Sequence, residues 1–402
     1  MQHSNHRIHA PTLKSERSRL LVLDELKRHA AAVQASASAS DLVRRRKPGP
    51  LPPTLSIGMT GVREDSSFDA YISVRLHGAA AGSACPLLLD SGNSVLVYPR
   101  FEDIQALPNY ATDYQVLGAG AEPWGCPANV VQGPIVLTTT DGLAVTLGDV
   151  VFYACTADLP GWTADSGLAH RTANFGAACL NPWTASAWNR PAGVASVLQT
   201  PLSYLVSHPY AVVQYGAGAV ADTPAGTPHI SLDSKLTLYT KRPAGFSCFE
   251  IVPNLEWMAL LAKSLSIGGI TSQWPGSTPA IAFIDTAGGC AFLSDPDRLL
   301  CNSVWPEQTG NPPWTAGSTG CQTIMASIAM EVGDATGSFT IAIDESALPA
   351  AAKGKTIVMC QLNEFMRGQY GLNIGGISAL THAILIDHRH KQVGFRSVGA
   401  VI

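Results

Sequence analysis

The sequence has few charged residues and lacks the patterns that mark membrane proteins and nucleic-acid-binding proteins. Asp, Glu, Lys and Arg make up 14% of its 402 residues, whereas an average soluble protein contains about 25%. No uninterrupted run of 18 apolar residues occurs, so we expect no membrane-spanning helix. The chain has no surplus of basic residues and no stripe of basic and aromatic residues. We therefore expect neither a membrane nor a nucleic acid as its partner.

Motifs of several enzyme and metal-binding classes are missing as well. The sequence contains no GxSxG and no HExxH motif, which removes the simplest serine-hydrolase and zinc-protease interpretations. Its nine cysteines include no CxxC pair, so we expect no metal site. This cysteine content favours disulfide bonds in a secreted or periplasmic protein, although no signal peptide is visible. Reduced structural cysteines are the alternative.

The residues that are present favour strands. The 37 glycines and 27 prolines separate short alternating or apolar runs, and those at 70–76, 134–137 and 143–147 predict strands. From residue 54 onward we expect helices only at 101–106 and 256–265. Without a regular alternation of strands and helices, this pattern predicts antiparallel sheets packed as sandwich-like or barrel-like units. The length predicts two large domains.

Two similar motifs lie 195 residues apart: PLLLDSGNS at 86–94 and AIAFIDTAGG at 280–289. In each, an apolar strand ends in an aspartate, Asp90 or Asp285, followed by a hydroxyl residue and a small residue. If the two motifs meet, the carboxylates face each other and share one proton, with one low and one raised apparent pKa. Such a pair can activate water and polarise a carbonyl group. This predicts amide hydrolysis without a cofactor.

At these residues the sequence resembles the pepsin-like aspartic proteases. After the first motif the chain continues as VLVYP, in the spacing of that family. FGAA at 175–178 and NIGG at 373–376 resemble the segments that support the two aspartate loops, and the runs at 383–387 and 392–395 resemble the closing strands. The resemblance covers about residues 54–402.

This resemblance implies a mainly β, bilobal fold, with an N-terminal lobe at 54–215, a C-terminal lobe at 216–402 and a cleft between them. It implies a monomeric endopeptidase that cleaves peptide or protein substrates with Asp90 and Asp285, and a disulfide between two cysteines of the second lobe. Two alternatives stay open: an inactive scaffold of the same fold that binds a protein or peptide, and a hydrolase of non-peptide amides. The residues implied to support the two aspartates are Ser91, Gly92, Asn93, Thr286, Ala287 and Gly288, and the implied disulfide joins Cys321 and Cys360.

The second motif departs from the family pattern. Ala287 and Gly288 stand where the family has Gly and a hydroxyl residue, and Asn93 replaces a hydroxyl residue in the first motif. The Ala287 methyl group must fit close to the dyad. Gly288 cannot donate a hydrogen bond to Asp285, and loss of such a donor favours the neutral carboxyl group. We therefore predict a dyad that works at less acidic pH than in most family members.

The segment that covers the substrate in this family is the weakest part of the resemblance. The family carries a Tyr in a covering hairpin and a Trp after the first aspartate loop, but here Val97 occupies the Trp position and no Tyr-Gly pair follows. We expect the hairpin within residues 117–133. Trp124 is the best candidate for the covering aromatic and Tyr114 the second. The alternative for Trp124 is an aromatic side chain packed on the lobe.

Residues 1–53 form a basic leader ahead of an acidic body. The first 50 residues carry 10 Lys and Arg against 4 Asp and Glu, a net charge of +6, and the remaining residues carry −10. Residues 16–34 predict an amphipathic helix, and the basic run at 44–47 precedes a proline-rich linker. Two interpretations are open: a disordered tail, or a pro-segment that inhibits the dyad until it is cleaved. The candidate inhibitory cations are Lys27, Arg28 and Lys47.

Overall fold

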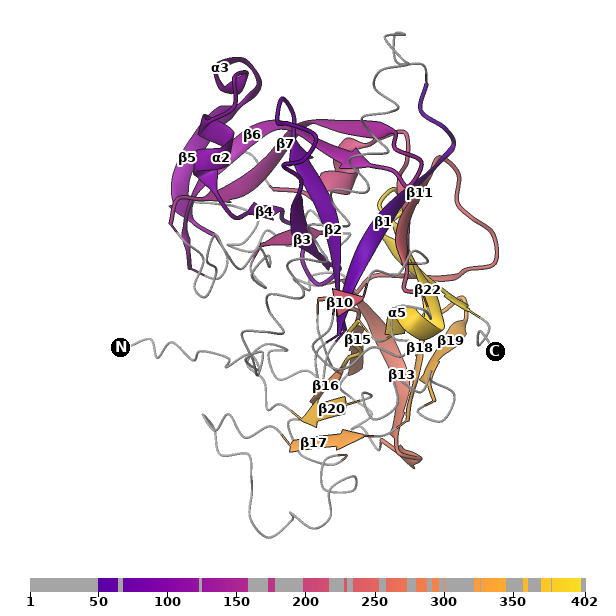
Figure 1. The fold of residues 1–402 in the computed structure, drawn as a ribbon. Helices are drawn as coiled ribbons and strands as arrows, with labels where there is room; N and C mark the ends of the chain where they lie inside the picture. Colours follow the sequence, from indigo (N-terminus) through magenta and orange to yellow (C-terminus); the bar gives the residue numbers. More distant parts are fainter. Residues whose placement is uncertain are drawn as a thin grey trace.

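The computed structural model of the chain is mainly β (Figure 1). It describes residues 50–63, 68–122, 125–157, 173–177, 198–216, 228–229, 234–252, 258–272, 280–287, 291–295, 300, 322–325, 327–344, 357–360, 370–376 and 378–398. The predicted leader helix, Trp124, Gly288 and Cys321 lie outside these residues. Within them, no helix combines the length and the apolar content needed to cross a membrane.

The larger sheet contains 14 strands within the described residues. Its main path runs β12-β23-β22-β9-β11-β1-β2-β6-β7-β4. In that order the strands are β12 (Ser247–Glu250), β23 (Gln392–Ser397), β22 (His382–Asp387), β9 (Tyr210–Gln214), β11 (Lys235–Tyr239), β1 (Thr54–Arg63), β2 (Phe68–Leu76), β6 (Pro127–Thr138), β7 (Ala144–Cys155) and β4 (Val97–Tyr98). Four further strands pair beside this path: β3 (Cys85–Asp90), β5 (Gln115–Ala121), β8 (Asn174–Gly176) and β10 (Pro228–His229).

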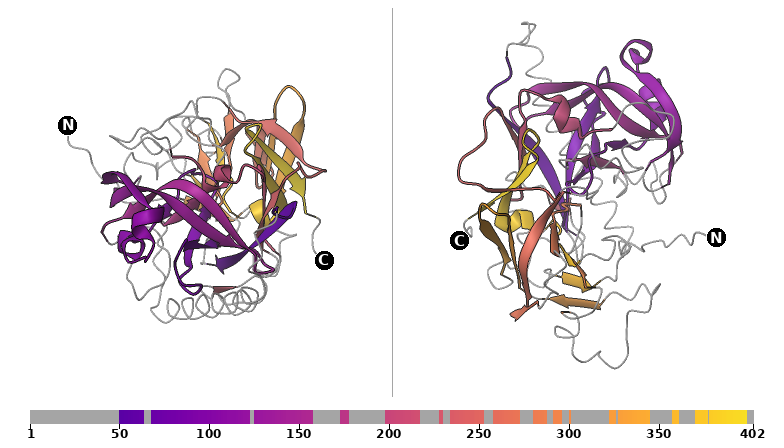
Figure 2. Two further views of the ribbon diagram at one scale, coloured as in Figure 1. Left: turned by 90° about the horizontal axis from the view of Figure 1, so that it is seen from above. Right: turned by 180° about the vertical axis from the view of Figure 1, so that it is seen from behind.

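The smaller sheet contains nine strands within the described residues, in the order β17-β20-β16-β21-β15-β13-β18-β19 with β14 paired to β13. Figures 1 and 2 place β5 and β6 at one end of the described molecule and β16, β17 and β20 at the other. The strands are β17 (Gln322–Met325), β20 (Ile357–Cys360), β16 (Ala291–Ser294), β21 (Gly371–Asn373), β15 (Ala280–Phe283), β13 (Ala259–Ile267), β18 (Ile328–Gly333), β19 (Ser338–Ile343) and β14 (Ile270–Thr271).

The larger sheet joins segments from both sides of residue 215. Strand β9 pairs with β11 on one side and with β22 on the other, where Leu385 lies opposite Val212. Both neighbours of β9 come from the range expected to form the C-terminal lobe. The larger sheet therefore contains strands from both predicted ranges.

The sheets are mixed and open, so two expectations need correction. Four strand pairs are parallel: β3–β8, β4–β7, β15–β21 and β16–β20. Parallel neighbours require long connections, and each of these pairs joins strands that lie more than 40 residues apart in the sequence. The two ends of each strand path do not pair with each other, so neither sheet closes into a barrel within the described strands.

The predicted strands at 70–76, 134–137 and 143–147 are confirmed as parts of β2, β6 and β7. The predicted helix at 256–265 is wrong, because residues 259–267 form β13. Leu260 and Leu265 are both buried although they are five residues apart, a spacing that cannot lie on one face of a regular strand. A bulge between Ala262 and Ser264 reverses the alternation and so hides the strand pattern in the sequence.

The described helices are short: α2 (Phe101–Gln105), α3 (Tyr110–Asp113), α5 (Ser378–Thr381) and the 3₁₀-helix η1 (Pro201–Tyr204). Helix α2 confirms the helix predicted at 101–106, and it buries Phe101 and Ile104.

The largest cluster of buried apolar side chains contains residues of both sheets, including Leu89 and Ile284, the neighbours of the two aspartates. Burial of one such side chain stabilises the fold by about 1.5–3 kcal/mol. The core therefore holds both aspartate-bearing strands in place.

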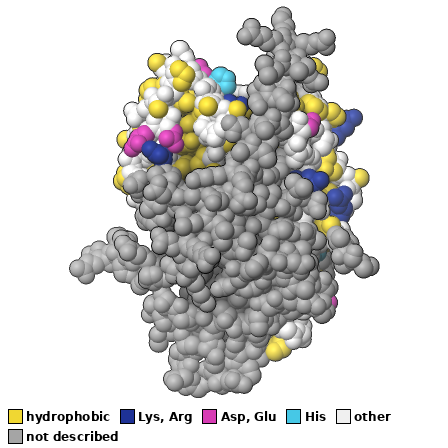
Figure 3. Space-filling view, in the orientation of Figure 1, with side chains coloured by type: hydrophobic (Ala, Val, Ile, Leu, Met, Phe, Trp, Pro, Cys, Tyr) yellow, Lys and Arg dark blue, Asp and Glu magenta, His cyan; other side chains and the backbone are white. Residues whose placement is uncertain are grey.

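On the face in Figure 3, the charged side chains of described residues are scattered singly or in small groups.

Candidate active site

Asp90 ends a strand that is buried almost throughout. Leu87, Leu88 and Leu89 of β3 are each at most 1% exposed, so this strand leads from the core directly to the carboxyl group. The Asp90 side chain is 6% exposed, and its Oδ1 accepts a hydrogen bond of 2.7 Å from the backbone N–H of Gly92. Asp90 pairs with Gly176 of the parallel strand β8. The carboxyl group is thus fixed by its own turn.

Asp285 follows β15 in a closely similar arrangement. Strand β15 pairs in parallel with β21, and Phe283 lies opposite Asn373. The Asp285 Oδ1 accepts a hydrogen bond of 3.0 Å from the backbone N–H of Ala287. Its Oδ2 accepts a hydrogen bond of 3.1 Å from Nδ2 of Asn373. Each aspartate therefore follows a buried strand with a parallel partner and accepts the N–H two residues later.

The two carboxyl groups meet at Gly92. A Cβ atom built on Gly92 would lie 2.8 Å from Cγ of Asp285 and 3.1 Å from Oδ1 of Asp90. Both carboxyl groups thus lie around one point, although the residues are 195 positions apart in the sequence. Gly92 is required here because a methyl group in that place would displace Asp285.

The hydroxyl residues of the two motifs bind the opposite loop. Ser91 Oγ accepts from the backbone N–H of Thr286 at 2.9 Å, and Thr286 Oγ1 accepts from the backbone N–H of Ser91 at 3.0 Å. Each hydroxyl also donates, Ser91 to the Ile284 carbonyl and Thr286 to the Leu89 carbonyl, both at 2.8 Å. All four hydrogen bonds are buried, and a network of satisfied buried groups is rigid. This network fixes the two aspartate loops against each other.

Further backbone contacts support the first loop. The N–H of Gly176 donates to the carbonyl of Val95 at 3.1 Å, and a Cβ on Gly176 would lie 2.3 Å from the carbonyl carbon of Ser94. Asn93, which replaces a hydroxyl residue of the family pattern, accepts the N–H of Val95 through Oδ1 at 2.8 Å. Asn93 therefore stabilises the turn of the first aspartate loop through its own side chain.

The second motif differs from the family pattern at Ala287 and Gly288, and the structure describes the first of these residues. Among the described residues, the only non-glycine residues with positive φ are Asp149 and Lys391, so Ala287 adopts an ordinary backbone conformation. Its methyl group packs against the hydrophobic core. The Asn373 amide donates to Asp285, whereas Gly288, which cannot, lies outside the described residues. The loss of a donor that we inferred from Gly288 is therefore offset by a residue from another strand.

Sequence reasoning did not identify Asn373 or Tyr215 as site residues. Asn373 stands two positions before Gly375 in the segment that supports the second loop, and its Oδ1 accepts the Gly375 N–H at 3.0 Å. The Tyr215 hydroxyl donates to the Thr286 carbonyl at 3.4 Å. The only available signal was the family-like NIGG segment, which begins with Asn373.

Strands β5 and β6 form a hairpin in the window expected for the covering segment, with Gln115 opposite Gln132 and Ala121 opposite Pro127. Trp124, the first candidate for the covering aromatic, lies outside the described residues. Tyr114 precedes the hairpin and is buried, and its hydroxyl donates to the Pro134 carbonyl at 2.8 Å. Val97 is fully buried in β4. Tyr114 is therefore anchored at the base of the hairpin.

No disulfide bond joins the four cysteines whose side chains the structure describes: Cys85, Cys126, Cys155 and Cys248. Burial raises the pKa of the Cys85 thiol to about 12 and also raises the pKa of Cys155, so these thiols stay protonated and unreactive. The pair Cys321–Cys360 falls outside the described side chains. Among described residues, no group of three His, Cys, Asp or Glu side chains is arranged to hold a metal ion.

Comparison with known proteins adds no family to this picture. No protein-family model matches this chain, and no curated protein matches its sequence.

Proposed function

We propose that the chain is an aspartic endopeptidase of the pepsin-like type, with Asp90 and Asp285 as its catalytic residues. The observation that carries this proposal is the convergence of the two carboxyl groups on Gly92. Two carboxyl groups this close favour a state with one shared proton, because two negative charges repel each other. One carboxylate can then act as a base while the other carboxyl group acts as an acid.

The reaction needs only water and these two groups. The ionised carboxylate removes a proton from water, whose oxygen bonds to the carbonyl carbon of the peptide. The neutral carboxyl group gives its proton to the carbonyl oxygen, which produces a tetrahedral diol. The nitrogen of the diol then takes up a proton from the dyad, and the C–N bond breaks. At the same time one hydroxyl group of the diol gives its proton to the dyad. The products are a carboxylic acid and an amine, and one proton remains on the dyad.

The surrounding residues support this chemistry in distinct ways. The Ser91–Thr286 network holds the two loops at the spacing that proton sharing requires. The Asn373 amide stabilises the negative charge on Asp285. The β5–β6 hairpin contains Gly118 and Gly120, which lower the cost of bending it over a bound peptide. We propose an apolar substrate preference, because no charged pocket base is recognisable in the sequence.

The first test is cleavage of a mixed peptide library from pH 3 to pH 8, with and without pepstatin, an inhibitor of aspartic proteases. We expect cleavage by the wild-type chain that is lost in Asp285→Asn and in the presence of pepstatin. The matched control is Asp149→Asn, because Asp149 is exposed and Asn also tolerates its φ of 53°. Its activity should equal that of the wild type.

The test is run on the full chain and on a chain without residues 1–50. If the basic leader inhibits the dyad, the shorter chain cleaves faster, and unchanged activity at every pH refutes that role. A folded chain without its leader that cleaves no peptide contradicts the endopeptidase proposal. That result would favour a scaffold that binds a protein or peptide, which peptide-library pull-down would detect.

A further inference from the structure

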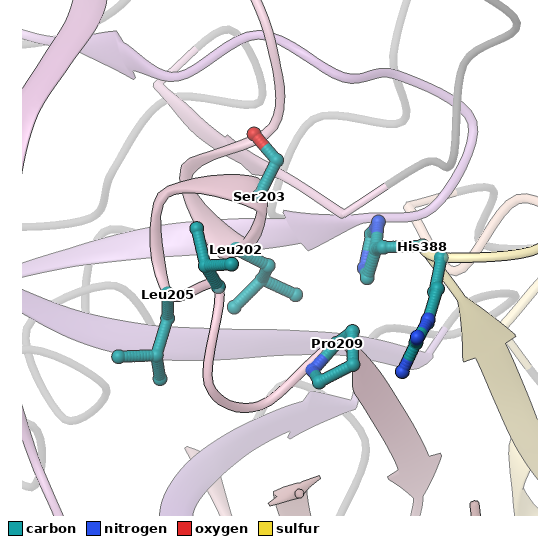
Figure 4. Close-up of a pocket in the computed structure, with 7 residues that line it drawn as sticks. Leu202, Ser203, Leu205, Pro209 and His388 are labelled. Carbon is teal, nitrogen blue, oxygen red and sulfur yellow. The ribbon is translucent and has the colours of Figure 1, made fainter.

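A hollow of about 460 Å³ lies between η1, the following loop and the turn after β22 (Figure 4). This volume falls within the ~300–1,000 Å³ typical of small-molecule sites. Strand β9 separates the hollow from the dyad: Pro209, just before β9, lines the hollow, whereas Tyr215, just after it, contacts Thr286. The hollow is therefore distinct from the proposed active site. Its lining residues are Leu202, Ser203, Leu205, Val206, Pro209, His388 and Arg389.

His388 lines this hollow and carries a hydrogen-bonding atom without a partner among the described residues. His388 is 8% exposed, and its backbone N–H donates to the Pro209 carbonyl at 3.0 Å. The imidazole Nε2 is buried and has no hydrogen-bond partner in the described structure. Burial, reinforced by the charge of Lys391, lowers the pKa of His388 to about 3, so the ring is neutral at pH 7. Buried polar atoms usually have partners, and a ligand in the hollow would supply one.

Arg389 places an available positive charge at the same hollow. Its side chain is exposed, and within the described part of the chain its guanidinium forms no ion pair. The nearby Asp387 carboxylate instead accepts the backbone N–H groups of Arg389 and His390 and pairs with Arg242 and the His390 ring. The positive charge of Arg389 therefore remains free to attract an anion.

Apart from Ser203, whose hydroxyl donates to the Thr200 carbonyl, the rest of the hollow is apolar. Leu202 and Leu205 are buried at its base, while Val206 is 83% exposed. Figure 4 shows Leu202, Leu205 and Pro209 on the side of the hollow that faces His388. Val206 extends the apolar surface of Leu202 and Leu205 to the rim of the hollow, where an apolar chain would cover it. The site thus combines apolar walls with one cation and one neutral ring nitrogen.

We propose that this hollow binds a small amphipathic carboxylate, with its carboxylate on Arg389 and His388 Nε2 and its apolar chain on Leu202, Leu205 and Val206. A neutral apolar ligand would leave the Arg389 charge unused. A compact, fully polar anion such as phosphate would leave the apolar walls uncovered. The carboxylate with an apolar chain satisfies both halves of the site.

The test uses octanoate as the probe and the full chain as the protein, with isothermal titration calorimetry as the measurement. We expect octanoate to bind at one site, and octan-1-ol, which has the same chain without the charge, to bind about tenfold more weakly. Arg389→Gln should weaken octanoate binding by about tenfold, and Val206→Glu should weaken it further because it adds a negative charge beside the hollow.

Arg100→Gln is the matched control, because Arg100 is a surface arginine that pairs with Glu102 away from the hollow. Its octanoate affinity should equal that of the wild type. Circular dichroism checks that each variant is folded. The proposal is overturned if octanoate does not bind. It is also overturned if octan-1-ol binds the wild type as tightly as octanoate does and Arg389→Gln binds octanoate as tightly as the wild type does. Asp285→Asn should bind octanoate normally, so this test is independent of peptidase activity.

Discussion

Acidification should destabilise this fold through two buried histidines, His382 and His388. His382 is 3% exposed and His388 8%. Burial lowers the pKa of His382 from 6.5 to about 4, against the opposing effect of a backbone hydrogen bond with Ser378. Burial and the neighbouring Lys391 lower the pKa of His388 from 6.5 to about 3, against the attraction of Asp387. Both rings are therefore neutral in the folded chain at pH values where the unfolded chain protonates them.

The sign and size of the effect follow from proton linkage. Below pH 6.5 the unfolded state binds a proton that the folded state does not, so stability falls as the pH falls. Each pH unit costs about 1.4 kcal/mol per histidine until the folded pKa is reached. At pH 4.5 the loss is about 2.7 kcal/mol for each ring. Together the two rings remove about 5 kcal/mol, a large part of the ~5–15 kcal/mol of a typical domain.

Urea unfolding at pH 7.5, 6.0 and 4.5 measures this loss in the wild type, His382→Asn and His388→Phe. Asn can replace the Nδ1 contact that His382 makes with Thr381, and Phe replaces a ring whose Nε2 has no partner. Each variant should lose about 2–3 kcal/mol less than the wild type between pH 7.5 and 4.5. If both variants lose as much stability as the wild type, the two histidines do not carry the acid sensitivity and the reasoning is refuted.

The same effect bears on the working pH of the proposed dyad. A fold that loses stability through neutral histidines below pH 6.5 is poorly suited to strongly acidic conditions. The histidines therefore favour a less acidic working pH by themselves, since Asn373 supplies a donor in place of the one that the second motif lacks. A rate profile centred below about pH 4, near the model Asp value of ~3.9, would contradict this argument.

Three further predictions concern the dyad. Gly92→Ala should reduce kcat/KM at least about 100-fold while the fold is kept, because its methyl group would lie 2.8 Å from Cγ of Asp285. Peptide cleavage measures the activity and thermal unfolding checks the fold. A fully active variant would contradict the close approach of Asp285 to Gly92. Asn373→Ala should shift the acid limb of the pH–rate profile to higher pH because Asp285 loses a donor to its charged form, and an unmoved profile would exclude this role. Thr286→Val should lower the free energy of unfolding by about 1–3 kcal/mol, because the buried N–H of Ser91 and carbonyl of Leu89 lose their partner, whereas Thr286→Ser, which keeps the hydroxyl, should stay close to the wild type.

The sequence allowed the local elements and the paired aspartate motifs to be predicted, because both depend on short patterns. The strand bearing residues 86–90 could be recognised from its apolar run and the turn that follows it. The Asn373 contact could not, because Asn373 lies 88 residues from Asp285 and nothing in the sequence marks which strand will lie beside β15. The bulge in β13 was missed for a related reason, since its pairing with β18 determines where the alternation reverses.

The position of β22 beside β9 has a consequence for how the protein can be made. Strand β9 comprises residues 210–214, and one of its two neighbours comprises residues 382–387. During synthesis the backbone groups of β9 on that side stay unpaired until some 170 more residues have been added, and unpaired strand edges are sites of aggregation. A fragment that stops before residue 382 would keep this exposed edge permanently, so expression of the chain in two halves should give insoluble protein.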